Sequence, residues 1–141
     1  AACTALTAFI PMLMNTGGNA GGQSSVSIIR ALSLNQIELK DIFKVMFKEF
    51  RISILCAIVL AACNFLKMLI FDKVTMLIAA SVCITLFVTV IIAKLIGCIL
   101  PIFAKKLGFD PAVMASPFIT TIVDACSLLI YFEIATMIIG L

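Results

Sequence analysis

The stretch PAVMASPFITTIVDACSLLIYFEIATMIIGL, from Pro111 to Leu141, decides how this chain must fold. At about 1.5 Å per residue it is long enough to cross a hydrocarbon core of about 30 Å as one helix. Asp124 would lie about 20 Å along that helix, well inside the hydrocarbon. A carboxylate at that depth is costly unless it is hydrated or paired. The stretch therefore predicts a spanning helix built around one buried acid, which we expect to serve a cation.

The composition requires a bilayer as the solvent. The 141 residues are 64% hydrophobic and 12% charged, whereas a soluble domain carries about a quarter charged residues. No part is polar enough for a separate soluble module, so residues 1–141 are predicted to form one membrane domain. The net charge is only +3 and the basic residues form no dense stripe, which argues against nucleic-acid binding. Histidine is absent, which excludes a histidine metal site and a histidine proton relay.

Charged residues divide the chain into apolar runs. These runs predict four spanning helices, at about 1–31, 52–71, 74–100 and 111–140. Lys67 and Lys94 interrupt two of the runs and are expected to snorkel toward the membrane surface. Between the first two runs, the apolar residues from Ile42 to Phe50 recur at helical spacing opposite lysines, which predicts an amphipathic helix that lies on the membrane surface and runs into the second span. The predicted fold class is an all-α polytopic bundle of four spanning helices and one interfacial helix.

The basic residues also predict an orientation. They concentrate in the first and third connections, while the middle connection holds only Lys67 and Lys73. Since cytoplasmic loops carry an excess of positive charge, the first and third connections should be cytoplasmic. Four spans then place both ends outside, and we expect at least one more helix to precede Ala1 in the natural protein.

Polar side chains are predicted to surround Asp124 on one face of the last span. Their offsets of three, four, seven and eight residues share a helical face. These side chains are Ser116, Thr120, Thr121, Ser127 and Tyr131. Such a stripe indicates the lining of a pore or cavity; the alternative is a hydrogen-bonded aspartate that only holds helices together. Glu133 lies half a turn away and nearer the outer end, so we expect it to have a separate role at headgroup level.

The stretch NTGGNAGGQSS, from Asn15 to Ser25, is the second unusual feature. It contains two overlapping GxxxG spacings, which are typical of helices that pack closely through small residues. Asn15, Asn19 and Gln23 recur every four positions, a polar stripe that packing does not require. They indicate a helix that lines a water-filled pore or cavity. The stretch has no GK[ST] ending and follows no strand, so it is not a phosphate loop.

The six cysteines form no CxxC pair and all lie in apolar runs. They are Cys3, Cys56, Cys63, Cys83, Cys98 and Cys126. We expect small packing residues, with disulfides or a zinc site as the alternatives.

One aspartate is a weak site for a divalent cation, but two copies across a two-fold axis would bring two carboxylates together. Without an ion these carboxylates repel each other, and a doubly charged cation between them restores the balance. Mg²⁺ keeps much of its water shell and often binds through one or two carboxylates. Two acids with a ring of hydroxyls and carbonyls would therefore suit a hydrated Mg²⁺ in a homodimer.

Several motifs resemble the MgtE family of magnesium channels. PMLMNTGGNAGGQSS (Pro11–Ser25), followed by IRAL (Ile29–Leu32), is similar to the second membrane helix of that family. LGFDPA (Leu107–Ala112), PFITTIVD (Pro117–Asp124) and LLIYF (Leu128–Phe132) are similar to the fifth. The helices between match in order and spacing, so the resemblance covers nearly the whole chain.

The resemblance implies a homodimer with five helices per subunit and a pore on the dimer axis. Asp124 matches the acid that binds hydrated Mg²⁺ through its water shell, and Thr120 matches a position whose backbone carbonyl helps to hold that ion. The other residues expected to line or gate the pore are Asn15, Gly18, Asn19, Gln23, Ser116, Pro117, Thr121 and Ser127. Ser116 stands where the family often has asparagine, near the cytoplasmic constriction.

The family also carries a first membrane helix, cytoplasmic Mg²⁺-sensing N and CBS domains and a plug helix, none of which matches this chain. The resemblance therefore implies a multi-pass pore domain of a bacterial plasma membrane, with lipid as its surroundings and Mg²⁺ as both cargo and ligand. The sensor domains are expected in the full-length protein.

Three functional classes follow from these features. The leading hypothesis is a channel that passes Mg²⁺ down its electrochemical gradient. The alternative is a secondary transporter or exchanger of divalent cations, since glycine-broken helices also occur in transporters. An intramembrane aspartyl protease would need two aspartates in one active site, whereas this chain has one at membrane depth, so we do not expect an enzyme.

Overall fold

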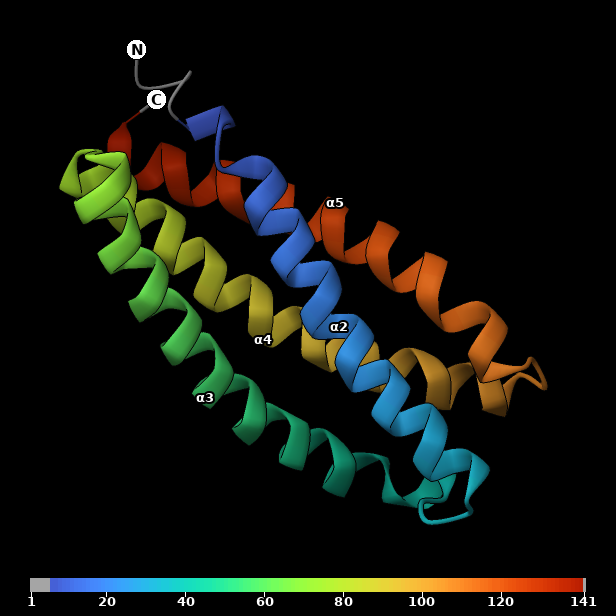
Figure 1. The fold of residues 1–141 in the computed structure, drawn as a ribbon. Helices are drawn as coiled ribbons and strands as arrows, with labels where there is room; N and C mark the ends of the chain where they lie inside the picture. Colours follow the sequence, from blue (N-terminus) through green and yellow to red (C-terminus); the bar gives the residue numbers. More distant parts are fainter. Residues whose placement is uncertain (1–5, 141) are drawn as a thin grey trace.

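The computed structural model describes residues 6–140, apart from the side chains of Leu39 and Met114–Ser116. Within that range the chain is made of helices joined by short turns, which confirms the predicted all-α class. The elements in order are α2 (Ile10–Ser33), the 3-10 turn η1 (Leu39–Asp41), α3 (Ile42–Lys67), the π-helical turn η2 (Met68–Asp72), α4 (Met76–Lys106) and α5 (Pro111–Ile139). The start of α2, η2 and the end of α5 lie at one end of the bundle (Figure 1). The connections 34–41 and 107–110 lie at the other end, so the two basic connections share a side.

Local sequence sets several helix ends. Asp110 precedes Pro111 at the start of α5, and its Oδ1 accepts the Ala112 N–H at 2.9 Å, which is the usual N-cap arrangement with proline in the first turn. Gly140 ends α5 in the left-handed region at φ 74°, where glycine has no steric penalty. Between η2 and α4, Lys73 turns the chain at φ 50°.

Helix α4 is the centre of the bundle. It packs against α2, α3 and α5. In the most apolar part of α4, 56% of the residues are buried inside the protein, against 11% for α3 with η2 and 22% for α5. The outer helices therefore expose large apolar side chains such as Leu55, Ile58 and Met137, as expected for surfaces that contact lipid.

Three helical segments have the length and apolar composition of membrane spans: Ile42–Asp72, Met76–Lys106 and Pro117–Ile139. The chain is thus a membrane protein. Helix α2 has 24 residues, but its glycines, amides and serines keep it below the apolar composition of a span. The predicted span at about 1–31 therefore remains a prediction, and residues 1–5 lie outside the described part of the chain.

The predicted amphipathic segment runs into the second predicted span as one helix, as expected. Residues from Ile42 onward are the first turns of α3, which continues without a break to Lys67. One side of these turns, including Val45 and Met46, packs on Ile28 and Leu32 of α2. This contact draws part of the apolar face into the bundle instead of leaving all of it for the membrane surface.

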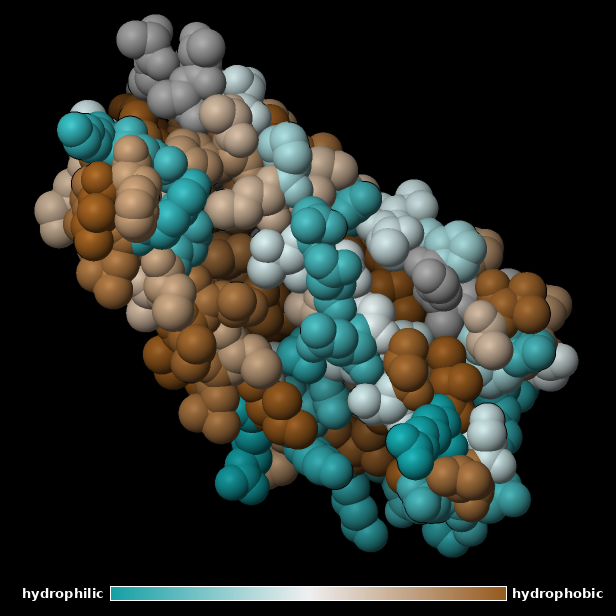
Figure 2. Space-filling view, viewed as in Figure 1, coloured by the Kyte–Doolittle hydropathy of each residue, from teal (hydrophilic) through white to brown (hydrophobic). Residues whose placement is uncertain are grey.

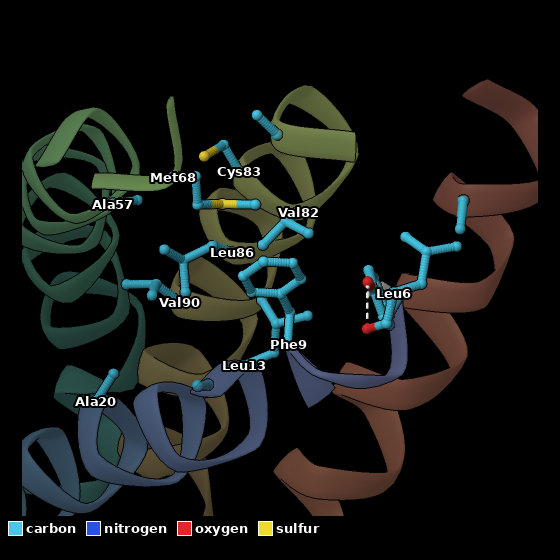
Figure 3. Close-up of a cluster of buried hydrophobic side chains, with 14 of the residues drawn as sticks. Leu6, Phe9, Leu13, Ala20, Ala57, Met68, Val82, Cys83, Leu86 and Val90 are labelled. Carbon is cyan, nitrogen blue, oxygen red and sulfur yellow. Dashed lines mark hydrogen bonds between the residues drawn. The ribbon is translucent and has the colours of Figure 1, made fainter. Parts of the chain in front are cut away.

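An apolar core joins the helices at the end of the bundle that holds η2. Figure 3 shows Phe9 and Leu13 pointing toward Met68, Val82 and Leu86 from η2 and α4. At the same end, the hydroxyl of Tyr131 donates to the Leu6 carbonyl at 2.8 Å. This bond connects α5 to the segment before α2.

The backbones of α2 and α4 meet at Gly21 and Gly97. A Cβ atom at Gly97 would overlap the carbonyl oxygen of Gly21, and one at Gly21 would lie 2.9 Å from the Ala93 carbonyl oxygen. One turn earlier, a Cβ at Gly17 would lie 2.8 Å from Thr89 Cγ2. The Gly17/Gly21 pair therefore allows α2 to pack closely on α4, as the GxxxG spacing predicts.

We predict that Gly97→Ala destabilises the bundle, because the added methyl group meets backbone that cannot move aside. Overpacking of this kind costs about 1–3 kcal/mol, which far-ultraviolet circular dichroism during detergent unfolding can measure. Gly22→Ala is the matched control, since a Cβ there meets nothing within 4 Å and alanine favours helix. Equal losses in the two variants would contradict the close contact.

Candidate functional site

Asp124 lies on α5 beside Gly18 of α2. A Cβ added at Gly18 would be 4.0 Å from Asp124 Oδ1, so the glycine leaves the carboxylate uncovered. The side chain is half-buried. Within residues 6–140, no hydrogen bond or ion pair reaches this carboxylate. A membrane-depth acid without an internal partner needs water, an ion or another chain for its stabilisation.

Two threonines accompany Asp124 on α5. The hydroxyls of Thr120 and Thr121 both donate to the Pro117 carbonyl, at 3.1 and 2.9 Å. The Thr121 oxygen keeps lone pairs that can accept from water. Pro117 has no N–H, so the Val113 carbonyl also loses its ordinary helical partner. Thr120, Thr121 and Pro117 are exposed in the single chain, and this part of α5 therefore offers acceptor oxygens toward the outside of the bundle.

The outer face of α2 is polar along much of its length. Asn15, Asn19 and Gln23 are exposed, and Asn19 Nδ2 donates to Asn15 Oδ1 at 3.3 Å. Figure 2 shows hydrophilic residues following the front of this helix between more apolar surfaces. Asn19 and Gln23 also border a groove between α2 and α3, whereas Gly18 is the α2 residue that approaches Thr120 and Asp124.

The polar stripe predicted on α5 divides into two parts. Thr120, Thr121 and Asp124 are open, but Ser127 and Tyr131 are buried at about 1% exposure. Ser127 donates to the Val123 carbonyl at 2.6 Å and faces Gly17 of α2. The twist of α5 against α2 turns this later part of the stripe inward, which the offsets alone could not show. The Ser116 side chain lies outside the described residues.

Two further predictions concern Glu133 and the cysteines. Glu133 is exposed, nine residues beyond Asp124 toward the end of α5. Cys83 and Cys98 are buried, and Cys56, Cys63 and Cys126 are at least partly accessible. All five are free thiols. Among the described residues there is no group of three or more potential metal-ligating side chains, so a zinc site finds no support there; Cys3 lies outside the described range.

Sequence reasoning missed a buried charged cluster that joins three helices. Ser24 on α2 donates to Glu49 Oε2 on α3 at 2.6 Å, and Lys94 Nζ on α4 donates to the Ser24 hydroxyl at 3.2 Å. Lys94 Nζ and Glu49 Oε2 are 3.8 Å apart, with side chains 8% and 10% exposed. The expectation that Lys94 snorkels is therefore wrong, because a buried carboxylate and hydroxyl hold its ammonium inside the bundle.

A signal for this cluster was present in the sequence. Ile42, Val45, Glu49 and Ser53 recur at helical spacing, so Glu49 lies on the inward face of α3. Its partner could not be identified from spacing, because Lys94 is 45 positions away along the chain. Only the packing of α3 on α4 brings the two charges together.

Comparison with known proteins assigns the chain to a family. Residues 10–134 match the model of the MgtE family, described as divalent cation transporters. The chain belongs to the MgtE family. That family is one of transporters, in agreement with the absence of enzymatic features in the sequence.

Curated relatives extend the match. The chain is 41% identical over 136 residues to the magnesium transporter MgtE of Bacillus subtilis, which covers 94% of the chain and 29% of the relative. It is 36% identical over 141 residues to the magnesium transporter MgtE of Thermus thermophilus, covering 97% and 30%. A third relative, from Enterococcus faecalis, is 33% identical over 135 residues. The chain thus spans about 30% of the length of these relatives.

We predict that Glu49→Gln destabilises the protein by about 3 kcal/mol, since it leaves Lys94 as an uncompensated buried charge. Lys94→Met should cost a similar amount by leaving Glu49 unpaired. The double variant Glu49→Gln/Lys94→Met should recover most of the loss. Unfolding midpoints in a denaturing detergent measure all three, and additive losses in the double variant would contradict a coupled pair.

Proposed function

We propose that this chain is the pore part of a magnesium channel, in which two copies place their Asp124 faces against a shared path. The observation that carries the proposal is the unpartnered Asp124 carboxylate beside Gly18, on an open polar face of a membrane protein. Lipid cannot satisfy such a face, because unpaired polar groups in hydrocarbon cost several kcal/mol. A second copy with enclosed water satisfies it from both sides.

Magnesium is the cargo that the chemistry favours. Two carboxylates facing each other across an axis supply the charge that balances a divalent cation. The neighbouring oxygens of Thr120 and Thr121 can accept hydrogen bonds from a water shell, which Mg²⁺ releases reluctantly. The relatives named as magnesium transporters support the same ion.

In this proposal each predicted residue has a separate task. Asp124 attracts the ion and binds its water shell, and the Thr120 backbone carbonyl helps to orient that shell. Gly18 keeps the approach to Asp124 open, since a side chain there would reach toward the carboxylate. The remaining residues proposed to line or gate the path are Asn15, Asn19, Gln23, Ser116, Pro117, Thr121 and Ser127. Ser127 would act from behind, by keeping α5 packed on Gly17.

The proposed setting is a bacterial plasma membrane with four spans in this chain, α2 included. Both basic connections then face the cytoplasm. The relatives are more than three times as long as the matched region, which leaves room for cytoplasmic sensor domains in the full-length protein.

An exchanger is the alternative, because a polar helix against a charged one also suits alternating access. Proteoliposomes loaded with a Mg²⁺-sensitive dye distinguish the two. A channel gives Mg²⁺ influx that follows the membrane potential and is unaffected by an imposed sodium gradient, whereas sodium-dependent influx would favour exchange.

Asp124→Asn should abolish Mg²⁺ influx into such vesicles and growth rescue of a magnesium-dependent bacterial strain. The amide has nearly the same shape, so the loss would report the missing charge. Glu133→Gln is the matched control, since it removes an exposed charge on the same helix and should retain most of the flux. Undiminished influx in Asp124→Asn would overturn the assignment.

Asp124→Cys should form a disulfide between two copies under mild oxidation in membranes. Ile58→Cys, on the exposed outer side of α3, should remain uncrosslinked, because this side is proposed to face lipid. Gel electrophoresis without reductant reads both results. Dimers at position 58 but none at position 124 would show that the copies meet through another face.

A further inference from the structure

A groove runs between α2 and α3, away from Gly18 and Asp124. We call it the α2–α3 groove; Val90 and Lys94 of α4, the helix that passes behind α2 and α3 in Figure 1, line its floor. Its volume is about 450 Å³. The residues that matter for its chemistry are Thr16, Asn19 and Gln23 on α2, Cys56 and Leu60 on α3, and Lys94 on α4.

One wall of the α2–α3 groove is polar and its floor carries a charge. Lys94 has three N–H donors, but its one hydrogen bond within residues 6–140 is to Ser24 at 3.2 Å. Glu49 Oε2, at 3.8 Å, is beyond hydrogen-bond distance. Lys94 lines a space that is large enough for about fifteen water molecules at roughly 30 Å³ each.

Lys94 and Glu49 line two different grooves. Lys94 lines the α2–α3 groove, whereas Glu49 lines a second groove of about 350 Å³ near the basic connection, together with Asp41, Lys44 and Lys48. The basic residue of the pair therefore lines one groove and the acidic residue lines the other. Thr16, Asn19 and Gln23 add hydroxyl and amide donors on the positive side.

From these observations we infer that the α2–α3 groove is a hydrated cavity that admits water and small anions and disfavours cations. Hydrocarbon cannot fill it without leaving the ammonium and the amides unsatisfied. An ammonium on its floor sets the sign of the local potential. The two sides of α2 are then chemically opposite: a carboxylate at Gly18 and an ammonium in the groove. This inference does not depend on the proposed magnesium pore.

Cys56 provides a native probe, since its half-buried thiol lines the groove. Methanethiosulfonates attach to thiolates, which form in water and are suppressed in apolar surroundings. The full-length protein in lipid nanodiscs is treated with an anionic reagent, sulfonatoethyl methanethiosulfonate, or a cationic one, trimethylammonioethyl methanethiosulfonate. Peptide mass spectrometry measures the modification rate at each cysteine.

The matched control is Leu55→Cys/Cys56→Ala. It moves the thiol by one residue at the same membrane depth, to a side chain that is 67% exposed on the outside of α3. Because hydrocarbon suppresses the thiolate there, Cys56 of the unchanged protein should react about tenfold faster or more. Equal, slow rates at both positions would overturn the inference and show that lipid or another segment fills the groove.

The two reagents test the charge. Each rate is divided by that reagent's rate with a free thiol in solution, because a thiolate by itself favours the cationic reagent. At Cys56 this normalised rate should be about threefold higher or more for the anionic reagent than for the cationic one, because a nearby ammonium attracts it. Glu49→Gln/Lys94→Met removes both charges without leaving one unpaired, and should bring the ratio close to one. Lys94→Arg should preserve it, and circular dichroism verifies the fold of each variant. A ratio at or below one in the unchanged protein, or a ratio insensitive to the double substitution, would overturn the role of Lys94.

Discussion

The contact between Gly21 of α2 and Gly97 of α4 determines how the polar helix sits in the bundle. Since backbone meets backbone there, α2 cannot rotate or slide without separating from α4. This constraint keeps Gly17 and Gly21 inward and leaves Asn15 and Asn19 on the outside. The polarity of the outer face is therefore a consequence of where the small residues must go, and Gly18 comes to lie beside Asp124 for the same reason.

Two acidic residues within the candidate membrane spans, Glu49 and Asp124, differ in whether they have partners inside the chain. Glu49 is buried with a lysine and a serine from two other helices. Asp124 has no such partner among residues 6–140. A charge with an internal partner contributes to holding helices together, while one without a partner remains available to something outside the chain. The contrast gives Asp124 a physical distinction from the other buried charges, beyond its match to a family position.

Because Lys94 lines the α2–α3 groove, α2 borders polar or charged groups on two of its sides. Asn19 and Gln23 border the groove that contains Lys94, while Gly18 approaches Asp124. Polar residues that recur every four positions drift slowly around a helix of 3.6 residues per turn, so one stripe can serve two surroundings. In the proposed pore and the proposed groove, α2 would have water on both sides, which would account for a composition less apolar than that of the other spans.

The sequence by itself determined the membrane class, the helical architecture and the basic connections on one side, and it singled out Asp124 as a candidate site, because each follows from composition or from spacing along a single helix. The packing role of Gly17 and Gly21 was also readable, since GxxxG is a local pattern. Only the tertiary structure decided that Ser127 and Tyr131 turn inward, that the apolar side of the lysine-rich segment packs partly on α2, and that Lys94 pairs with Glu49. These outcomes depend on the relative rotation of neighbouring helices and on contacts between residues far apart in the chain, which periodicity within one helix does not contain.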